Sequence, residues 1–199
     1  MTGRRGMSAV SRQELLGLIA QLAYREGDFL LSSGAKSPYY INCKTVTLHP
    51  RGAYLVGQLC QALLSPETVA VAGLTLGADP MVTAISLVSA QTNHPVSALI
   101  IRKEPKGHGA CSQIEGPLPP PGSWVTVVED VVTTGQSLGL AVEVLRTAGY
   151  RVGQGIALVD RQQGGSDYLA QKGVTLTALF TLAEVQALYV QRQSQATGG

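Results

Sequence analysis

Two adjacent acids, Glu129 and Asp130, lie where an apolar segment ends and a turn rich in hydroxyl groups begins. The turn, residues 133–137, reads Thr-Thr-Gly-Gln-Ser and leads into a pattern of helical period. Its backbone N–H groups, its hydroxyls and the positive end of the following helix together suit a phosphate monoester. The two carboxylates could accept hydrogen bonds from the vicinal hydroxyls of a ribose and favour positive charge at its anomeric carbon. The motif therefore predicts chemistry on a ribose 5-phosphate.

Other phosphate-binding motifs do not fit this turn. It lacks the lysine and the spacing of the nucleotide-triphosphate P-loop, and it lacks the three glycines of the dinucleotide fingerprint. A plainer interpretation stays open, in which the acids mark a solvated strand end and the Thr-Gly-Ser turn only caps a helix, as is common where a strand meets a helix. The pairing of two acids with a phosphate cradle favours the ribose phosphate.

A second candidate segment is basic. Arg102, Lys103, Lys106 and His108 lie within seven residues that follow an apolar run, and glycines interrupt them. A mobile loop that carries cations can close over a diphosphate leaving group, offset its charge and keep water from the reacting carbon. The alternative is an exposed basic loop without a role. Its position one strand before the phosphate turn favours the functional interpretation.

Regular alternation of apolar runs and helical patterns predicts the elements that position these residues. Strands are expected at 68–74, 96–101, 124–132, 152–160 and 173–181, and helices at 79–91, 137–149 and 182–190. Continuous apolar strands that alternate with helices indicate an α/β fold with a central parallel sheet covered on both faces. Such sheets bind ligands at the carboxyl ends of their strands, which is where the acid pair would lie.

The N-terminal part carries two further helical patterns. Ser11 and Glu14 form a capping-box pattern that predicts a helix over roughly residues 12–25. Pro50 stands at a first helical position, and the apolar pattern behind it stops before Pro66, so a second helix is expected between them. Both chain ends, residues 1–10 and 191–199, are polar and are expected to be flexible.

Composition limits the class of protein. The 199 residues are 45% hydrophobic and 14% charged, which predicts one globular domain over residues 1–199. The 15 basic and 13 acidic side chains nearly balance, so we expect no binding to nucleic acid or to a membrane surface. No apolar run approaches the ~20 residues of a membrane span. Cys43, Cys60 and Cys111 lack metal-ligand spacing, which favours reduced thiols in a cytoplasmic protein.

The stretch VVEDVVTTGQS resembles the phosphoribosyl-diphosphate (PRPP) binding motif of the type I phosphoribosyltransferases. The resemblance implies their fold, with a small N-terminal hood beside the sheet. It also implies that Glu129 and Asp130 contact the ribose hydroxyls and that the turn holds the 5-phosphate. The positions that the motif assigns to PRPP after the acids are Val131, Val132, Thr133, Thr134, Gly135, Gln136 and Ser137.

The basic segment resembles the catalytic loop of the orotate phosphoribosyltransferases, whose pattern Arg-Lys-x-x-Lys-x-His-Gly it matches. This implies that Arg102, Lys103, Lys106 and His108 contact the diphosphate of PRPP. Lys103, Lys106 and His108, together with Asp130, are implied to be catalytic. In that family the loop, here residues 102–109, reaches into the neighbouring subunit's site, so a homodimer is implied.

Three further segments resemble the same family in the expected order. Residues 27–44 match its hood motif, and Gly73 to Pro80 match the loop that contacts diphosphate near the sugar. Arg161 stands where the family has the arginine that pairs with the orotate carboxylate, a role that suits a planar guanidinium, and Thr133 would also contact the base. Some members have Lys where Ser32 stands, which leaves one diphosphate contact in doubt.

The implied reaction converts PRPP and orotate into orotidine 5'-phosphate and diphosphate, a step of UMP biosynthesis. Mg²⁺ is expected to be held mainly by the substrate's own oxygens and by water, without a protein metal cage. Two alternatives stay open. The chain could be a regulatory protein that senses PRPP, or a phosphoribosyltransferase for another base.

Overall fold

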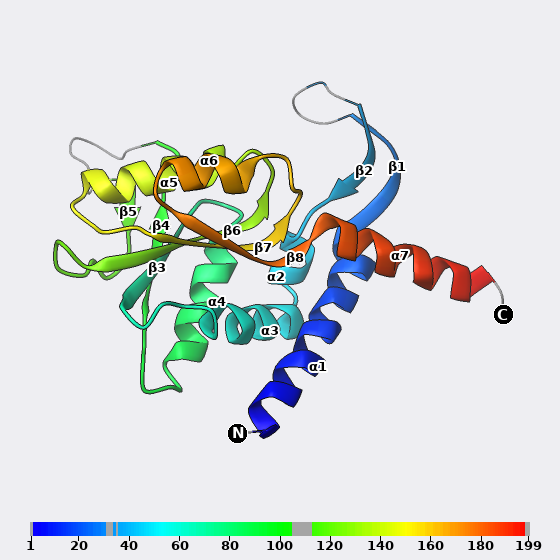
Figure 1. Ribbon diagram of the computed structural model, residues 1–199, viewed down its shortest axis with the longest axis horizontal. Helices are drawn as coiled ribbons and strands as arrows, with labels where there is room; N and C mark the ends of the chain where they lie inside the picture. The colour runs from blue at the N-terminus through cyan, green and yellow to red at the C-terminus, as the bar shows by residue number, and fades with distance from the viewer. Residues whose placement is uncertain (1, 31–33, 35, 105–112, 198–199) are drawn as a thin grey trace.

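The computed structural model describes residues 2–30, 34, 36–104 and 113–197. Its centre is a six-stranded sheet with the order β5-β4-β3-β6-β7-β8 (Figure 1). The strands are β3 (Thr68–Leu74), β4 (Ser97–Ile101), β5 (Ile114–Glu115), β6 (Trp124–Val132), β7 (Gln154–Asp160) and β8 (Thr175–Thr181). Neighbouring strands are parallel except β4 and β5. The predicted α/β class with a mostly parallel central sheet is confirmed, and the short antiparallel β5 is an addition that the sequence pattern did not indicate.

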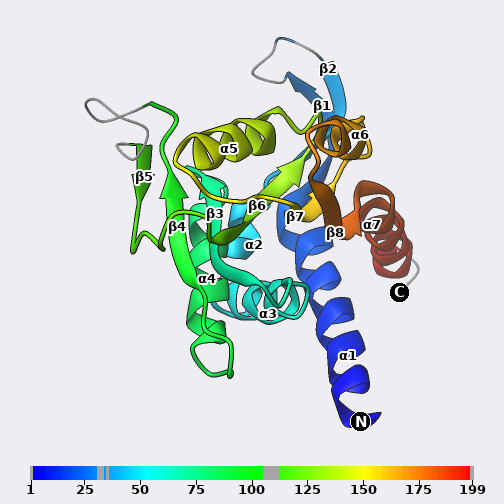
Figure 2. The same ribbon diagram turned by 60° about the vertical axis from the view of Figure 1, so that its left-hand side comes forward.

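Helices cover both faces of this sheet (Figures 1 and 2). On one face lie α5 (Gln136–Thr147) and α6 (Gly165–Gln171); on the other lie α3 (Pro50–Gln61) and α4 (Asp79–Ser89). None of the helices in the described part of the chain is long and apolar enough to cross a membrane.

Two clusters of buried apolar side chains fill the spaces between sheet and helices. Consecutive residues of the central strand β6 belong to different clusters: Val127 lies in the cluster under α5, and Val128 lies in the cluster with α3 and α4. Side chains of a strand alternate between its two faces, so a strand covered on both sides must be apolar at successive positions. This is why β3 and β6 could be placed from their apolar runs at the bounds that the structure has.

The first helix differs from the prediction. α1 (Thr2–Leu18) begins near the chain start, and Ser11 lies inside it rather than at its N-cap. No proline occurs among residues 2–11, so a cap-like pair of residues does not stop the helix from extending further towards the N-terminus. The helix then passes into a π-helical turn, Ile19–Ala23, and ends at Tyr24, whose backbone is extended.

The C-terminal helix is likewise longer than expected. α7 (Leu182–Thr197) continues through most of the tail that the sequence pattern left irregular. Neither glycine nor proline occurs between residues 182 and 197, so nothing in the local sequence ends the helix earlier. The helix leads away from the sheet towards the C-terminus (Figure 1).

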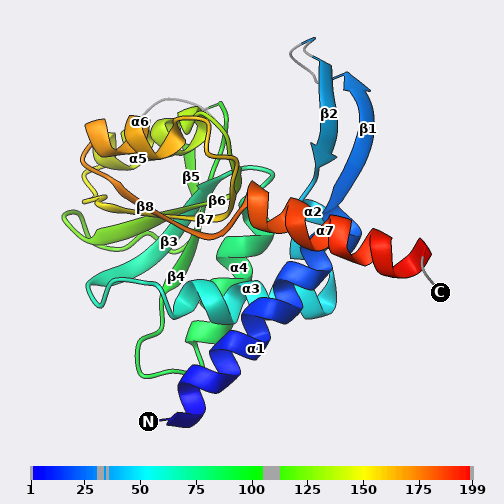
Figure 3. The ribbon, with the colours of Figure 1, turned by 45° about the vertical axis from the view of Figure 1, so that its right-hand side comes forward.

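An antiparallel hairpin stands beside the sheet as the expected N-terminal hood (Figure 3). Its strands are β1 (Tyr24–Leu30) and β2 (Lys36–Ile41), and the short α2 (Lys44–Thr47) follows. The Asn42 N–H donates to the carbonyl oxygen of Ala23 at 2.9 Å and closes the base of the hairpin. The carboxyl ends of β3, β6 and β7 lie at one edge of the sheet, and the loops that follow them build the site described next.

Candidate active site

The acid pair occupies the carboxyl end of β6 and is buried. Glu129 is 8% exposed and Asp130 is 7% exposed. The Asp130 carboxylate accepts a hydrogen bond from the Val131 N–H at 2.9 Å, and its Oδ2 lies 3.8 Å from the Lys44 Nζ. Glu129 Oε2 has no hydrogen-bond partner among the described residues. A buried acceptor without a partner is costly, so this oxygen is available to a donor from a ligand.

The environment of Glu129 changes its protonation. Burial, with a further contribution from the negative charge of Asp130, raises the pKa of Glu129 to about 8. The positive charge of Lys44 acts in the opposite direction and lowers the pKa of Glu129. The shift favours the protonated form of the Glu129 carboxyl.

The loop after β3 supports the pair from the opposite side. A β-carbon added at Gly77 would lie 2.7 Å from Asp130 Oδ1 and 3.2 Å from Glu129 Oε1, so the backbone approaches the acids more closely than any side chain would allow. The Thr75 hydroxyl donates to Asp79 Oδ2 at 2.8 Å and stiffens the loop. The Thr75 N–H donates to the Ile101 carbonyl oxygen at 2.8 Å, which ties this loop to the strand before the basic segment.

The hydroxyl-rich turn encloses a cavity of about 140 Å³, lined by Glu129 and by residues 131–138. Gly135 lies in the left-handed region with φ 79° and precedes the first residue of α5. A β-carbon at Gly135 would lie 3.0 Å from the Gly165 carbonyl oxygen, and one at Gly165 would lie 2.5 Å from Val132 Cγ1. The turn thus packs directly on the start of α6, and its cavity lies at the N-terminus of the twelve-residue helix α5, where N–H groups without an intrahelical partner favour an anion.

Arg161 and Thr133 are brought together, as the sequence analysis expected of two residues that contact one base. The Arg161 Nη1 donates to the Thr133 hydroxyl at 3.3 Å. Tyr39 of the hood completes this group, since its hydroxyl accepts from Arg161 Nη2 at 2.6 Å and Nε at 3.2 Å. The hood therefore contacts the sheet edge directly at the predicted base site.

The start of the basic segment lies at the neighbouring strand. Arg102 Nε donates to Glu115 Oε1 of β5 at 2.9 Å, so in this structure the guanidinium pairs with the sheet edge and not with the acid pair. Lys103 follows and is exposed. Lys106 and His108 lie outside the described residues, so the structure does not test their roles.

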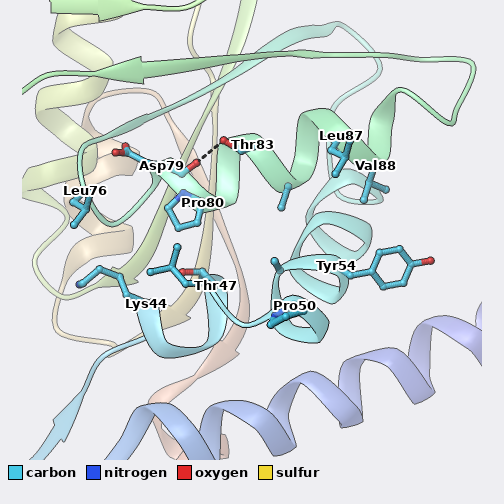
Figure 4. Close-up of a pocket in the computed structure, with 13 residues that line it drawn as sticks. Lys44, Thr47, Pro50, Tyr54, Leu76, Asp79, Pro80, Thr83, Leu87 and Val88 are labelled. Atoms are coloured by element: carbon cyan, nitrogen blue, oxygen red, sulfur yellow. Dashed lines mark hydrogen bonds between the residues drawn. The ribbon is translucent and has the colours of Figure 1, made fainter.

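A larger cavity of about 570 Å³ adjoins the site on the side of α2, α3 and α4 (Figure 4). Lys44, Leu76 and Asp79 lie at one end of this cavity, and most of the remaining lining is apolar. Lys44 connects this end to the acid pair, because its Nζ lies 3.8 Å from Asp130 Oδ2. Lys44, Gly77 and Tyr39 were not predicted to act on the site's charged groups. The segments that contain them resemble family motifs, but no local pattern indicates these contacts, because each residue reaches its partner from an element far away in the sequence.

Comparison with known proteins identifies first the class and then the family to which this protein belongs. No protein-family model matches the chain. Adenine phosphoribosyltransferase of Leishmania donovani, at 14% identity and a TM-score of 0.61 over 85% of this chain and 80% of its own, shares the fold alone. Orotate phosphoribosyltransferase of Mycobacterium tuberculosis matches with a TM-score of 0.78 at 35% identity, over 88% of this chain and 98% of its own. By fold and site this protein is a type I phosphoribosyltransferase.

Sequence relatives narrow the class. An orotate phosphoribosyltransferase of Nostoc sp. is 58% identical over 178 residues, which are 89% of this chain and 86% of the relative. One of Synechocystis sp. is 58% identical over 181 residues, which are 91% of each chain. The chain belongs to the orotate phosphoribosyltransferase family.

Proposed function

We propose that the protein transfers the 5-phosphoribosyl group of PRPP to orotate and releases diphosphate, forming orotidine 5'-phosphate on the route to UMP. The observation that carries this proposal is the meeting of Arg161 and Thr133 at the mouth of the hydroxyl-rich turn, with the buried acid pair on the strand before it. A carboxylate-binding arginine, a phosphate cradle and a ribose-binding pair in one site match the three parts of the product. PRPP is also present in a structure of the M. tuberculosis relative.

In this proposal the acid pair holds the ribose. The 2- and 3-hydroxyls donate to Glu129 and Asp130, and one of them supplies Glu129 Oε2 with a donor that the described residues do not provide. As the bond from the anomeric carbon to diphosphate lengthens, the ring becomes cationic, and the adjacent carboxylates stabilise that charge in a site from which water is excluded.

The turn from Val131 to Ser137 holds the 5-phosphate, because its residues line the 140 Å³ cavity and supply hydroxyls and backbone N–H groups that can bind an anion. Orotate enters already ionised, so it needs placement more than activation. Arg161 and Thr133 supply that placement by binding its carboxylate and its ring. The attacking nitrogen of the base then lies beside the anomeric carbon of the sugar held by the acid pair.

The basic segment acts on the leaving group. Arg102, Lys103 and Lys106 offset the charge of the departing diphosphate, and His108 hydrogen-bonds or protonates it. For this role Arg102 would exchange its contact with Glu115 for one with the diphosphate. Mg²⁺ bound to PRPP supplies further charge neutralisation. The buried carboxylate oxygen of Glu129 fits this arrangement as an acceptor for sugar hydroxyls, and the metal's own ligands are substrate and water oxygens.

We also propose a homodimer in which residues 102–109 of one subunit reach the site of its partner. This rests on the likeness of the loop to the family's catalytic loop. A cytoplasmic location is consistent with the free, buried thiols of Cys43 and Cys60.

An assay of orotate consumption tests the activity. The purified protein should remove the ultraviolet absorbance of orotate only when PRPP and Mg²⁺ are both present. Adenine, hypoxanthine and uracil in place of orotate separate this activity from that of a phosphoribosyltransferase for another base. Binding of PRPP without consumption of any base would instead indicate a regulatory protein and would overturn the proposal.

A further inference from the structure

Tyr39 occupies one edge of the arginine that the proposed function assigns to the base. The Arg161 guanidinium has a side edge, made by Nε and Nη2, and an end edge, made by Nη1 and Nη2. Both side-edge nitrogens donate to the Tyr39 hydroxyl, at 3.2 Å and 2.6 Å. The guanidinium carbon also lies 5.1 Å from the centroid of the Tyr39 ring, within the range of cation–π attraction.

A further hydrogen bond of Arg161 determines which edge of its guanidinium faces the site. Nη1 lies 3.3 Å from the Thr133 hydroxyl, at the start of the phosphate turn. The backbone N–H of Arg161 donates to the Val132 carbonyl oxygen at 2.8 Å. This hydrogen bond holds the main chain at Arg161 to the end of β6, the strand that leads into the turn. With its side edge on Tyr39, Arg161 presents the end edge towards the turn where the sugar is expected.

Tyr39 is itself supported from behind. Its ring stacks on Tyr24, with centroids 5.9 Å apart and an angle of 23° between the planes. Tyr24 is 1% exposed and meets the edge of Tyr189 in α7 at 5.0 Å, and its hydroxyl accepts from Gln186 Nε2 at 3.1 Å. This aromatic column, Tyr39–Tyr24–Tyr189, connects the C-terminal helix to Arg161 through the hood, and it restricts the phenol to one position.

We propose that Tyr39 is a positioning residue for base recognition, which holds the side edge of Arg161 so that the end edge, Nη1 and Nη2, binds the carboxylate of orotate. The inference rests on the proposed function, because it assumes that Arg161 binds that carboxylate. A planar fork binds a carboxylate well only when its orientation is fixed beforehand. Without the phenol, the long side chain must lose its rotational freedom on binding.

The test compares two nucleotides that differ only in the carboxylate. Tyr39→Phe keeps the ring and its stacking and removes the hydroxyl. Calorimetric affinities are measured for orotidine 5'-phosphate and for uridine 5'-phosphate, with wild type and variant. We expect about a tenfold loss of affinity for orotidine 5'-phosphate, the scale of a lost hydrogen bond to a charged group, and less than about a twofold change for uridine 5'-phosphate. In steady state, the KM for orotate should rise while the KM for PRPP stays unchanged.

Tyr40→Phe is the matched control. Tyr40 is the next residue of the same strand, is 45% exposed, and packs against Phe29 with ring centroids 5.6 Å apart. Removal of its hydroxyl should leave both affinities unchanged. In an Arg161→Ala background, Tyr39→Phe should cause no further loss, because the phenol acts only through the arginine.

Equal losses for both nucleotides, or undiminished affinity of Tyr39→Phe for orotidine 5'-phosphate, would overturn the inference. A lowered Tm of Tyr39→Phe together with a further loss in the Arg161→Ala background would mean a structural role only and would overturn it too. The proposed function fails differently: wild type itself would then neither consume orotate nor prefer orotidine 5'-phosphate over uridine 5'-phosphate.

Discussion

Gly77 lies directly against the carboxylate of Asp130, since a β-carbon on this glycine would come within 2.7 Å of Oδ1. The loop after β3 therefore sets how far the acid pair can move towards it. Gly77→Ala forces Asp130 to shift, because contacts this short do not occur. Displacement of a positioned catalytic group by a fraction of an ångström lowers kcat/KM by up to about a hundredfold. Steady-state kinetics of the variant measure this.

Gly155→Ala is the control for that change. Gly155 lies in β7, and a β-carbon there would meet Leu176 Cδ1 at 3.4 Å, an ordinary contact. We expect kcat/KM near that of wild type for Gly155→Ala. If Gly77→Ala lowered kcat/KM no more than Gly155→Ala does, the loop would not determine the position of the acids.

Lys44 favours the ionised form of Glu129. Burial raises the pKa of Glu129 to about 8, and the positive charge of Lys44 opposes this rise. Because ribose hydroxyls donate to the pair, the carboxylate form is the better acceptor, and kcat/KM for PRPP should rise with pH through this range. In Lys44→Met the rise should move to higher pH, and Lys44→Arg should restore the profile. Rates measured from pH 6 to 10 test this shift.

Lys172→Met serves as the control, because it removes a partly exposed lysine that pairs with Glu143 and not with Glu129 or Asp130. Its pH profile should coincide with that of wild type. If the pH profile of Lys44→Met coincided with that of wild type, Lys44 would not influence the protonation of Glu129.

The raised pKa of Glu129 also makes stability depend on pH. The folded protein binds this proton more tightly than the unfolded chain does, since the pKa rises from 4.5 to about 8 on folding. The free energy of unfolding should therefore fall as the pH rises from 4.5 towards 8 and should level off above that range. Glu129→Gln cannot ionise, so its Tm should exceed that of wild type by several degrees at pH 9 and by much less at pH 5.

Thermal denaturation across this range checks the Glu129→Gln prediction, with Glu67→Gln as the control. Glu67 is exposed, so its neutralisation should change Tm equally little at both pH values. If the Tm difference between Glu129→Gln and wild type did not grow with pH, the prediction that burial raises the pKa of Glu129 would be contradicted.

Gly135 is expected to be needed for PRPP binding because of its close contact with Gly165, in addition to its left-handed backbone angle. Gly135→Ala combines an unfavourable left-handed conformation with a 3.0 Å contact to the Gly165 carbonyl oxygen. Gly164→Ala is strained similarly, at φ 89°, but its β-carbon would meet nothing within 4 Å. We expect Gly135→Ala to raise the KM for PRPP about tenfold or more and Gly164→Ala to leave it nearly unchanged, although both lower Tm. Equal KM values would show that the strain alone matters.

Subunit mixing tests the proposed exchange of the basic loop. Lys106→Ala and Asp130→Asn should each be nearly inactive and still unfold in one cooperative thermal transition. Mixed dimers contain one site with an intact acid pair and an intact loop only if the loop comes from the partner. Random mixing should then recover about a quarter of wild-type activity, since half the dimers are mixed and each has one working site. No recovery in demonstrably mixed dimers would place the loop over its own subunit's site.

The sequence predicted those strands and helices whose positions are determined by the residue types within them. β3 and β6 have the expected bounds because buried parallel strands are apolar throughout and end at polar turns. α6 was missed because it begins at the second of two adjacent glycines and its seven residues are too few to display a helical period. The start of α1 was misplaced because Ser11 and Glu14 resemble a cap, whereas the helix simply continues through them.

The sequence could predict those parts of the candidate site that directly follow a strand of the sheet. Glu129 and the phosphate turn are contiguous in sequence, and Arg161 follows the neighbouring strand, so sheet topology alone brings it to Thr133. Tyr39 reaches Arg161 across 122 positions of the chain, and Gly77 reaches Asp130 from a different loop. Such contacts depend on how the hood and the loop after β3 pack, which no short stretch of sequence encodes.

The aromatic column has a consequence for shortened forms of the protein. A chain truncated after Thr181 would keep all six strands of the central sheet and both acids, and it would pass as a complete domain by inspection of its sheet. It would lack Tyr189 and Gln186, the supports behind Tyr24. Expression trials that trim the C-terminus should therefore stop beyond Tyr189.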